Sequence, residues 1–337
     1  MRNKIVDFLK SDAFFVICLL LFFIICNIKL DYFINIGGGI SNVESRVNVV
    51  DKYKSDGSFN ISYVSQMDAN VLTYLISYLV PSWEREKASN YKYNSNESMK
   101  DISFRSDLDL DVANSTATYW AYTLANKEVK ATSKKAYITV NLLNIKGLKV
   151  GDELITIDGH EFSDIKQCQD YVQTKKVGDE VTLKIIRNNK EKEFKVKVQE
   201  EDGKNMIGIG IQYYVEYKTD PEVTFNFKKS ESGPSGGLIT TLELYNQLTK
   251  KDLTGGKTIA GTGTIEVDGT IGEIGGIEHK ILGASKAHAD IFLTPGGDNY
   301  KDAKKYIKEK NLKIKLIKVE TIQEAIDILE ELKWESE

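Results

Sequence analysis

The sequence has few cysteines and few histidines, with three of each among 337 residues. Cys18 and Cys26 both fall inside an apolar run near the N-terminus, which leaves Cys168 alone in the rest of the chain. One cysteine cannot form a disulfide framework, and the histidines (His160, His279 and His288) are too scattered for a zinc site. We therefore expect no metal and no other cofactor.

The sequence also lacks an excess of either charge, since it contains 45 basic and 49 acidic residues. A protein that binds nucleic acid through a basic surface would show a surplus of lysine and arginine, so we do not expect nucleic acid as a partner. At ~100 to 200 residues per domain, the length allows about two domains and some shorter segments.

Charged residues are absent from residues 13–28, which consist almost entirely of large apolar side chains. As a helix this run would be ~24 Å long, shorter than a ~30 Å hydrocarbon core, and the flanking Lys10 and Lys29 could extend to the two interfaces. Basic residues precede the run, and no small-residue cleavage site follows it. We interpret residues 1–36 as a cytoplasmic tip and an uncleaved transmembrane signal anchor, with the rest of the chain outside the cytoplasm. A cleaved signal peptide is the alternative.

Residues 37–134 show no internal repeat and no motif that carries chemistry. We interpret them as a linker or a subdomain. Apolar periodicity predicts one helix at residues 71–79, with Asp68 as its cap, and another at residues 107–126. The polar residues 87–100 between them are predicted to form a loop.

Residues 135–200 are predicted to form a small β-rich unit. A turn, a strand and a tight Asp-Gly turn are indicated by the run Leu148-Lys149-Val150-Gly151-Asp152-Glu153-Leu154-Ile155-Thr156-Ile157-Asp158-Gly159. The other predicted elements are a strand at residues 136–140, a helix at 165–174, and strands at 180–187 and 193–199. This succession resembles a PDZ domain, and any small β-barrel with an Asp-Gly turn is the alternative.

The resemblance to PDZ domains raises the question of peptide binding. A PDZ domain holds a peptide's C-terminus in a glycine-containing loop before the strand that the peptide extends. No Gly-aromatic-Gly sequence occurs in residues 132–146, before Gly147. The sequence therefore gives no basis for predicting that this unit binds peptide C-termini.

Residues 230–238 read S-E-S-G-P-S-G-G-L and lead into a predicted helix. Apolar residues recur after Gly237 at steps of four, three and three: Leu238, Leu242, Tyr245 and Leu248. Ser235 then lies at a helix N-terminus, where unpaired N–H groups and the macrodipole favour an anion or a developing oxyanion. The simpler interpretation is that a serine only caps the helix.

A nucleophilic serine needs a base to remove its proton. The histidines have no acidic partner at a fixed spacing, so the sequence gives no reason to expect a Ser-His-Asp triad. The other available base is a lysine whose pKa is lowered by burial. Lys280 is a candidate, because apolar residues surround it on a predicted helix that follows Gly275-Gly276. A lysine at the solvated edge of the helix is the alternative.

The surroundings of Lys280 have a recognisable order. A strand is predicted at residues 258–267, with a turn at Asp268-Gly269 and a return at residues 270–274. The apolar face of the predicted helix that follows consists of Ile277, Ile281, Ala284 and His288.

Taken in order, the segments G-P-S-G-G-L, I-A-G-T-G-T-I and D-G-T-I-G-E-I-G-G-I-E-H-K resemble the proteolytic domain of the Lon family, from about residue 223 to residue 332. The resemblance implies that Ser235 is the nucleophile, Lys280 its general base and Thr262 an orienting residue. It also implies that the oxyanion and the substrate backbone are bound near Gly233, Pro234 and Gly236.

This sequence departs from the Lon pattern beside the nucleophile. The family usually carries an acidic residue three positions before the serine, whereas this chain has Ser232 there and Glu231 one position earlier. The residue after the serine is often alanine in the family and is Gly236 here.

With the predicted anchor and the PDZ-like unit, the whole chain resembles the membrane-anchored PDZ-Lon proteins of Gram-positive bacteria, the YlbL type. The expected fold class is α+β: an N-terminal transmembrane helix, a PDZ-like small β-barrel at residues 135–200 and a Lon-type proteolytic α/β domain at residues 201–337. The resemblance implies protein or peptide substrates, a single-pass membrane anchor and assembly into a homo-oligomeric ring.

No ATPase module is recognisable in the sequence. Residues 254–258 read T-G-G-K-T, like the end of a phosphate-binding loop, but a strand is predicted after Lys257, where such a loop needs a helix. We therefore expect a serine endopeptidase that works without ATP. The alternative is a catalytically silent, membrane-tethered scaffold that binds protein partners.

Overall fold

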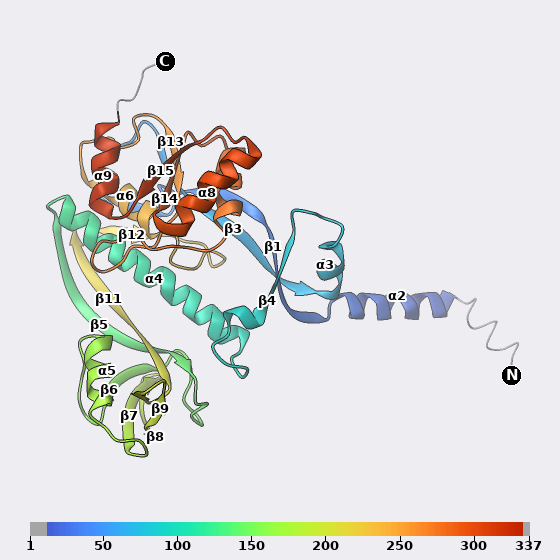
Figure 1. Cartoon of the computed structure of the whole chain (residues 1–337), viewed down its shortest axis with the longest axis vertical. Coiled ribbons are helices and arrows are strands. Elements are labelled where there is room, and N and C mark those ends of the chain that lie inside the picture. Colours follow the sequence, from blue (N-terminus) through green and yellow to red (C-terminus); the bar gives the residue numbers. More distant parts are fainter. Residues whose placement is uncertain (1–11, 333–337) are drawn as a thin grey trace, which may run out of the picture. The chain divides into compact units, whose positions relative to one another are not determined.

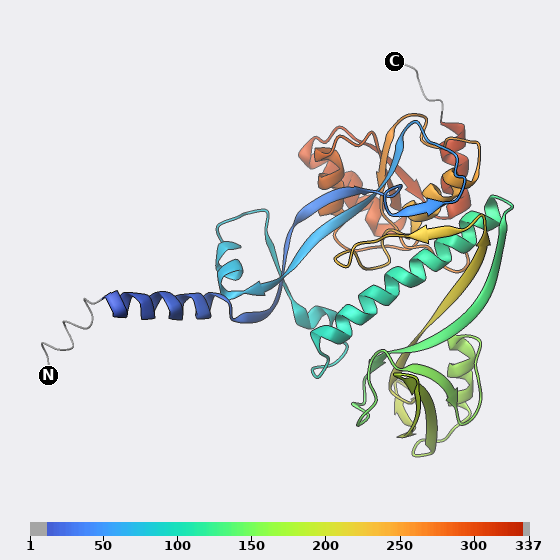
Figure 2. The same cartoon turned by 180° about the vertical axis from the view of Figure 1, so that it is seen from behind.

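The computed structural model describes residues 12–332 (Figures 1 and 2). The chain divides into two compact units. The N-terminal unit comprises Met1–Gly38 with Val64–Lys92, and the main unit comprises Gly39–Tyr63 with Tyr93–Glu337. Two long strands, β1 (Lys29–Asn42) and β3 (Ser58–Asn70), contribute to both units.

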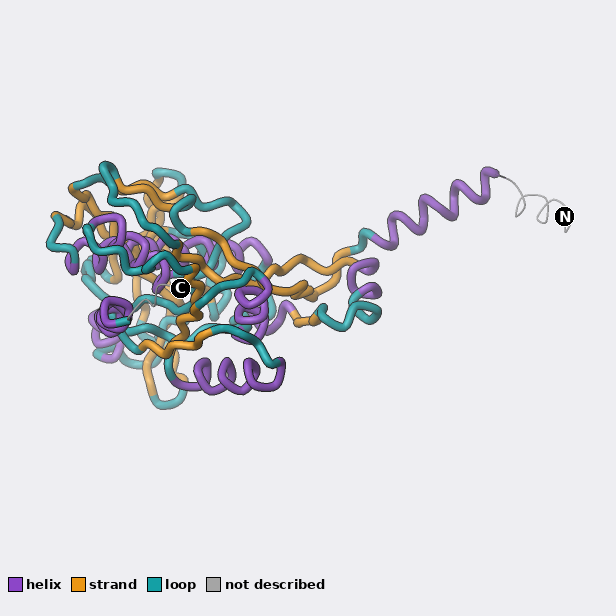
Figure 3. Tube along the Cα trace, turned by 90° about the horizontal axis from the view of Figure 1, so that it is seen from above, coloured by secondary structure: helices purple, strands orange, loops and turns teal. Residues whose placement is uncertain are grey.

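The N-terminal unit begins with α2 (Asp12–Cys26), an apolar helix of 15 residues (Figure 3). The predicted run at residues 13–28 is helical as far as Cys26, and β1 starts at Lys29. Within residues 12–332, none of the helices is both long and apolar enough to cross a membrane. The predicted cytoplasmic tip, residues 1–11, lies outside the described residues.

The helix predicted at residues 71–79 is shorter and has a different cap. It is α3 (Val71–Ile76), and Asn70 caps it by accepting a hydrogen bond from the Thr73 backbone N–H. The prediction that Asp68 is the cap was wrong, because β3 continues to Asn70 and carries Asp68 in its extended backbone. The unit is completed by β4 (Glu84–Lys87), antiparallel to β1, and by the 3-10 helix η1 (Ala88–Tyr91).

A long helix, α4 (Met99–Leu124), opens the second part of the main unit. The sequence predicted this helix only from residue 107 and a loop up to residue 100. The earlier start has a local cause, because the Ser98 side chain accepts a hydrogen bond from the Asp101 N–H while the Asp101 side chain accepts one from Ser98. One face of α4 packs on α6 (Gly237–Leu248) of the C-terminal region and another on strands β5 (Glu128–Asn141) and β11 (Ile209–Asp220).

The β-rich unit is a five-stranded antiparallel sheet in the order β11-β5-β6-β7-β8. Its predicted central elements are present. The bounds are β5 (Glu128–Asn141), β6 (Glu153–Ile157), α5 (Ile165–Gln173), β7 (Glu180–Arg187), β8 (Lys190–Lys197) and β11 (Ile209–Asp220). A small hairpin of β9 (Gln199–Glu201) and β10 (Lys204–Met206) precedes β11. The sheet thus takes in a strand that lies beyond residue 200, and β5 starts well before residue 136.

The aspartate of the Gly151-Asp152 pair, in the run that begins at Leu148, forms a buried ion pair. Asp152 is 1% exposed and accepts hydrogen bonds from the Arg187 guanidinium and from the Lys149 N–H. Arg187 also donates to the Gly147 carbonyl at 2.8 Å. These bonds to Asp152 raise the pKa of Arg187 although its partial burial opposes the charge. The pair fastens the turn before β6 to the end of β7.

The C-terminal α/β region is built on strands in the order β15-β14-β13-β3-β1. Strands β3, β13 (Thr258–Gly261), β14 (Ile291–Pro295) and β15 (Lys315–Val319) run parallel. Side chains of α4, α6 (Gly237–Leu248) and α9 (Ile322–Glu331) share one core with one face of the sheet. Side chains of α7 (Ile277–Lys286) and α8 (Gly297–Lys310) pack with the other face. A short antiparallel pair, β2 (Val47–Val49) with β12 (Val223–Phe225), lies outside this sheet.

Two predictions for the C-terminal region need correction. The strand predicted at residues 258–267 ends at Gly261, because the chain then leaves the sheet to hydrogen-bond to the loop that contains Ser235. His288 does not belong to the apolar face of α7, since the helix ends at Lys286 and His288 is exposed with a left-handed φ of 57°. The other three predicted members of that face are buried.

Candidate active site

The helix after Ser235 begins where the sequence predicted. Gly236 is the N-cap of α6, and all twelve residues of the helix are buried, so α6 has no solvent face. The glycines are required by close packing. A Cβ atom on Gly236 would lie 2.8 Å from Ile61 Cδ1, and one on Gly237 would lie 2.6 Å from Ile265 Cγ2. Ser235 is thereby held close against the interior of the domain.

Backbone hydrogen bonds fix the loop on both sides of Ser235. The Gly233 N–H donates to the Ser106 carbonyl of α4 at 2.8 Å, and Gly233 itself has a φ of +86°, which favours glycine. The Ser235 carbonyl accepts from the Gly263 N–H at 2.8 Å. Among residues 12–332, the Ser235 hydroxyl and the N–H groups of Ser235 and Gly236 make no hydrogen bond. The half-buried hydroxyl is therefore available to react.

Lys280 lies on α7, which starts after Gly276 in the left-handed conformation with a φ of 69°. Only 5% of Lys280 is exposed, and its neighbours Ile277, Ile281 and Ala284 belong to a buried apolar cluster. Burial lowers the pKa of Lys280 to about 8. The alternative of a lysine at the solvated edge was therefore wrong, because α7 turns this side chain toward the sheet.

Thr262 connects the two candidate residues. The Lys280 ammonium Nζ donates to Thr262 Oγ1 at 3.0 Å, and the same hydroxyl donates to the Ser235 carbonyl at 3.0 Å. Thr262 is fully buried, and its own N–H donates to the Leu293 carbonyl of β14. The structure thus brings Ser235, Thr262 and Lys280 together. No direct hydrogen bond joins Ser235 Oγ to Lys280 Nζ in the described residues.

The two residues that precede the Gly-Pro-Ser turn differ in their surroundings. Ser232 is exposed, whereas the Glu231 carboxylate is bound by the Arg46 guanidinium and by the Lys228 N–H. These bonds lower the pKa of Glu231 although desolvation by burial, the largest single influence, acts in the opposite direction. The acidic residue of this loop is therefore held in an ion pair with Arg46.

Three residues of the site come from residues 39–63, where the sequence indicated no chemistry. Arg46 binds Glu231, Ile61 packs on Gly236, and the Ser62 hydroxyl donates to the Lys280 carbonyl at 2.7 Å. The only usable signal was the alternation of apolar and polar residues along β3. That pattern predicts a strand but does not reveal which strand it will pair with.

A glycine-containing loop is present in the β-rich unit, at a different place from the one the sequence suggested. Residues 206–210 read M-I-G-I-G; Ile207 and Gly208 connect β10 to β11, and Gly208 has a left-handed φ of 65°. β11 is the edge strand of its sheet. The edge strand with a glycine before it is therefore β11, the last strand of the unit along the chain. The sequence did not show that this strand would lie at the edge of the sheet.

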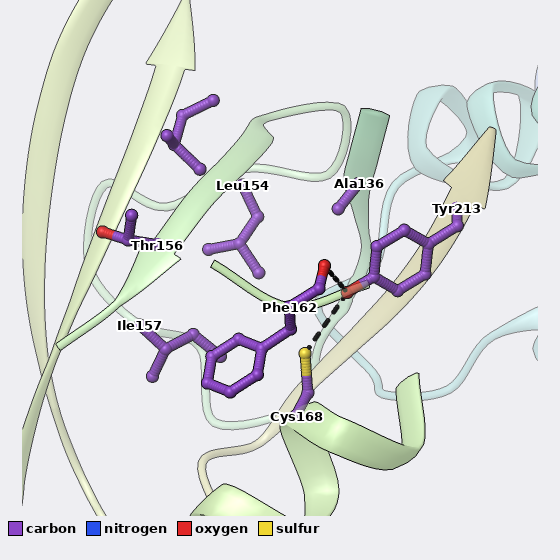
Figure 4. A pocket seen from close by; sticks show the side chains of 8 residues that line it. Ala136, Leu154, Thr156, Ile157, Phe162, Cys168 and Tyr213 are labelled. Carbon is purple, nitrogen blue, oxygen red and sulfur yellow. Dashed lines mark hydrogen bonds between the residues drawn. The ribbon is translucent and has the colours of Figure 1, made fainter. Parts of the chain in front are cut away.

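A small pocket lies between β11 and α5, lined by Ala136, Leu154, Ile155, Thr156, Ile157, Phe162, Cys168 and Tyr213 (Figure 4). The Tyr213 hydroxyl donates to the Phe162 carbonyl at 3.1 Å and lies 3.4 Å from Cys168 Sγ. Burial raises the pKa of the Cys168 thiol, so this cysteine is a packing residue and not an activated nucleophile.

Comparison with known families gives two matches within the chain. Residues 139–198 match the PDZ domain, and residues 228–331 match the Lon protease (S16) C-terminal proteolytic domain. A Lon protease of Trichlorobacter lovleyi is 33% identical over 98 residues, which is 29% of this chain and 12% of that protein. The chain therefore spans only a small part of the length of this relative.

Solved structures of PDZ domains also align with part of the chain. The PDZ domain of an SdrC-like protein from Listeria monocytogenes is 28% identical and covers 24% of this chain and 92% of its own, with a TM-score of 0.23. The corresponding domain from Listeria innocua is 32% identical and covers 23% and 92%, with a TM-score of 0.20. This chain carries a PDZ domain followed by a Lon-type proteolytic domain of the serine peptidase class S16, and it is similar to Lon protease over about 98 residues.

Proposed function

We propose that the protein is an endopeptidase that uses Ser235 and Lys280 as a catalytic dyad and works without ATP. The observation that carries this proposal is the buried Lys280, whose pKa is lowered to about 8 and whose amine is held by Thr262. Near neutral pH a useful fraction of such a lysine is uncharged and can accept a proton. No stretch of the sequence resembles an ATPase module.

The first step is transfer of the Ser235 hydroxyl proton to neutral Lys280 as the serine oxygen attacks a peptide carbonyl. The protonated lysine then gives this proton to the leaving amine, and an acyl-enzyme remains. Water hydrolyses the acyl-enzyme by the same route, with Lys280 again as the base. Thr262 keeps the lysine amine in place through both half-reactions, because its hydroxyl is anchored to the Ser235 carbonyl.

The oxyanion of the tetrahedral intermediate needs hydrogen-bond donors. The backbone N–H groups of Ser235 and Gly236 have no acceptor among residues 12–332 and lie at the start of α6. A preorganised donor of this kind contributes about 3 to 4 kcal/mol to transition-state stabilisation in other proteases. We assign the oxyanion site to this turn, with Gly233 and Pro234 beside the substrate backbone.

We propose that the substrates are protein or peptide segments, and that the PDZ domain contributes to holding them. The glycine-containing connection at residues 207–208 and the position of β11 at the edge of its sheet support addition of an extended peptide to the sheet. Membrane anchoring and an extracytoplasmic location also belong to the proposal, as in PDZ-Lon proteins of the YlbL type. They are supported by the exposed apolar side chains of α2, among them Phe15 and Phe22. Digestion of the PDZ domain by protease added to intact cells would test the orientation. We extend the proposal to a homo-oligomeric ring.

The test of the dyad is a casein-cleavage assay of the full chain from pH 6 to pH 10, with Ser235→Ala, Lys280→Ala and Lys280→Arg. We expect each variant to lose activity by a factor of about a thousand or more. Wild-type activity should fall about tenfold for each pH unit below about 8, because the protonated lysine cannot act as a base.

The arginine variant is the sharpest control, since it keeps a positive charge that cannot be removed near neutral pH. Activity in Lys280→Arg, or cleavage that survives Ser235→Ala, would exclude the dyad. Partner binding that all three variants retain, with no cleavage by wild type, would instead indicate a scaffold.

A further inference from the structure

We infer that the segment Gly39–Tyr63 is part of the catalytic apparatus, with Arg46 and Ser62 as positioning residues for the two halves of the dyad. This inference rests on the proposed Ser-Lys function. The family match to the proteolytic domain starts at residue 228 and does not include this segment. The segment nevertheless belongs to the same compact unit as the dyad residues.

Arg46 holds the loop that leads to Ser235. Its Nε lies 2.9 and 2.8 Å from the two carboxylate oxygens of Glu231, and Nη2 lies 2.7 Å from Oε1. The side chains are 14% and 27% exposed, so the pair is largely shielded from water. The carbonyl of Arg46 also accepts the Asn226 N–H at 2.7 Å. Arg46 therefore holds both ends of residues 226–231: its carbonyl binds Asn226, and its guanidinium binds Glu231.

The Arg46–Glu231 contact differs from an exposed ion pair. A guanidinium that donates two bonds to one carboxylate is geometrically specific, and each bond is stronger than a neutral hydrogen bond. The Lys228 N–H adds a further bond to the same carboxylate at 2.7 Å. The remainder of the loop is held through its backbone, by the Gly233 N–H on Ser106, the Pro234 carbonyl on Gly237 and the Ser235 carbonyl on Gly263. The ion pair is thus the side-chain clamp on the nucleophile side of the site.

Ser62 holds the other half of the site. It is fully buried, and its hydroxyl donates to the Lys280 carbonyl at 2.7 Å. The bond ties the backbone of the general base to β3. Because side chains alternate along a strand, the preceding residue Ile61 faces the opposite side of the sheet, where it packs on Gly236. Two successive residues of β3 therefore contact opposite parts of the site: Ser62 contacts the backbone of the base Lys280, and Ile61 contacts Gly236 next to the nucleophile.

The register of the sheet places these contacts beside Thr262. Ile61 pairs with Gly261 across the parallel β3–β13 ladder, and Thr262 is the next residue after Gly261. The strand from the N-terminal segment thus runs alongside the residue that links Lys280 to Ser235. A small displacement of β3 would change the separation of the dyad residues, and misplacement by about 1 Å lowers rates by about a hundredfold in other enzymes.

The test on the nucleophile side compares Arg46→Met, Arg46→Lys and the control Lys251→Met, which breaks the exposed ion pair with Glu330. Active sites are counted with a fluorophosphonate that labels the reactive serine, and casein cleavage is expressed per labelled site. We expect Arg46→Met to lower kcat per site about tenfold or more, and Arg46→Lys to restore part of it, since lysine supplies the charge without the fork. Lys251→Met should match wild type.

The test on the base side compares Ser62→Ala, Ser62→Thr and the control Ser115→Ala, which removes a similar hydroxyl-to-carbonyl bond between α4 and β11. We expect Ser62→Ala to lower kcat per labelled site about fivefold, as for the loss of one buried hydrogen bond. Ser62→Thr should recover activity because it keeps the hydroxyl. The pH profile should keep its midpoint, because Ser62 contacts the carbonyl of Lys280 and not its amine.

A role in folding alone would give a different result: fewer labelled sites, each with the wild-type kcat. That outcome for both Arg46→Met and Ser62→Ala would overturn the inference. Hydrogen exchange supplies a measurement that does not depend on cleavage. Exchange at residues 226–236 should accelerate in Arg46→Met and not in Lys251→Met. If wild type neither cleaves casein nor reacts with the fluorophosphonate, the proposed function fails, and unchanged exchange in Arg46→Met would separately refute the clamp.

Discussion

The PDZ domain and the Lon-type domain bury charged groups in opposite ways. In the PDZ domain the buried Asp152 carboxylate is paired with Arg187 and accepts a hydrogen bond from the Lys149 backbone N–H. In the Lon-type domain Lys280 is buried with a hydroxyl as its partner, and no carboxylate of residues 12–332 forms an ion pair with it. Pairing favours the charged form of Arg187, whose pKa is raised by its hydrogen bonds to Asp152. The absence of pairing lets the second group lose its charge near neutral pH, and a general base requires that property.

The Lon-type domain contains a second buried ionisable group that forms no ion pair among residues 12–332. Glu243 on α6 is 4% exposed, and its carboxylate accepts a hydrogen bond from Gln247 Nε2 at 2.6 Å. Burial raises the pKa of Glu243 to about 7, although the bond from Gln247 opposes this shift. The domain therefore contains two ionisable groups that are unfavourable in their charged forms. The difference between the domains can be tested through their stabilities.

The largest effect on stability is expected in the PDZ domain. Arg187→Met would leave the buried Asp152 without its cation, and breaking a buried pair in this way destabilises proteins by about 3 to 5 kcal/mol. Urea unfolding followed by circular dichroism should show a lower midpoint. The control is Lys184→Met, on the same strand β7 as Arg187, which removes an ion pair with Glu191 of β8. That pair is more exposed, so the midpoint should not change. Equal midpoints for the two variants would show that the buried Asp152–Arg187 pair contributes no more to stability than an exposed pair does.

The effect of Lys280→Met should have the opposite sign. The folded-state pKa of about 8 lies below the 10.5 of an unperturbed lysine, so the unfolded chain binds more protons between these values and wild-type stability rises with pH there. At pH 7 the whole penalty is present, and it corresponds to ~3 kcal/mol for such a difference in pKa. Lys280→Met should therefore be more stable than wild type at pH 7 and should lack the rise between pH 8 and pH 10.5. A destabilised variant at pH 7 would show that Lys280 is not buried as a charged group, and the exposed Lys250→Met is the control.

A smaller gain is expected from Glu243→Gln. The folded-state pKa of about 7 lies above the ordinary 4.5, so the folded protein binds more protons between these values, and stability falls as the pH rises through them. At pH 8 the glutamine variant should be more stable by ~2 kcal/mol, since the amide removes the buried charge but must still be buried itself. At pH 4 the difference should disappear. Glu309→Gln, at an exposed position of α8, should show no such pH dependence.

The sequence predicted the parts of the site that depend on local pattern. The start of α6 at Gly237, the helix that carries Lys280 and the central elements of the PDZ domain all follow from periodicity and from glycines at turns. The cap of α3 and the start of α4 were predicted less well, because several polar residues near each helix start could serve as the cap.

The residues that the sequence did not reveal are those whose partners are distant along the chain. Arg46 and Glu231 are 185 positions apart, and Ser62 and Lys280 are 218 positions apart. The sheet of the PDZ domain likewise depends on β11, which follows the other four strands in sequence but pairs with β5. Strand pairing of this kind is decided by how whole elements pack, and no local propensity encodes it.

The sequence by itself determined which chemical groups are present and in what order: a serine before a buried helix, a lysine on an amphipathic helix and a threonine between them. Only the tertiary structure decided what these groups can do. Lys280 becomes a candidate base because the sheet and its neighbours exclude water from its amine, and a pKa depends on that environment and not on the residue type alone. The same packing places a strand from residues 58–70 against both Gly236 and the Lys280 backbone, which are far from it in sequence.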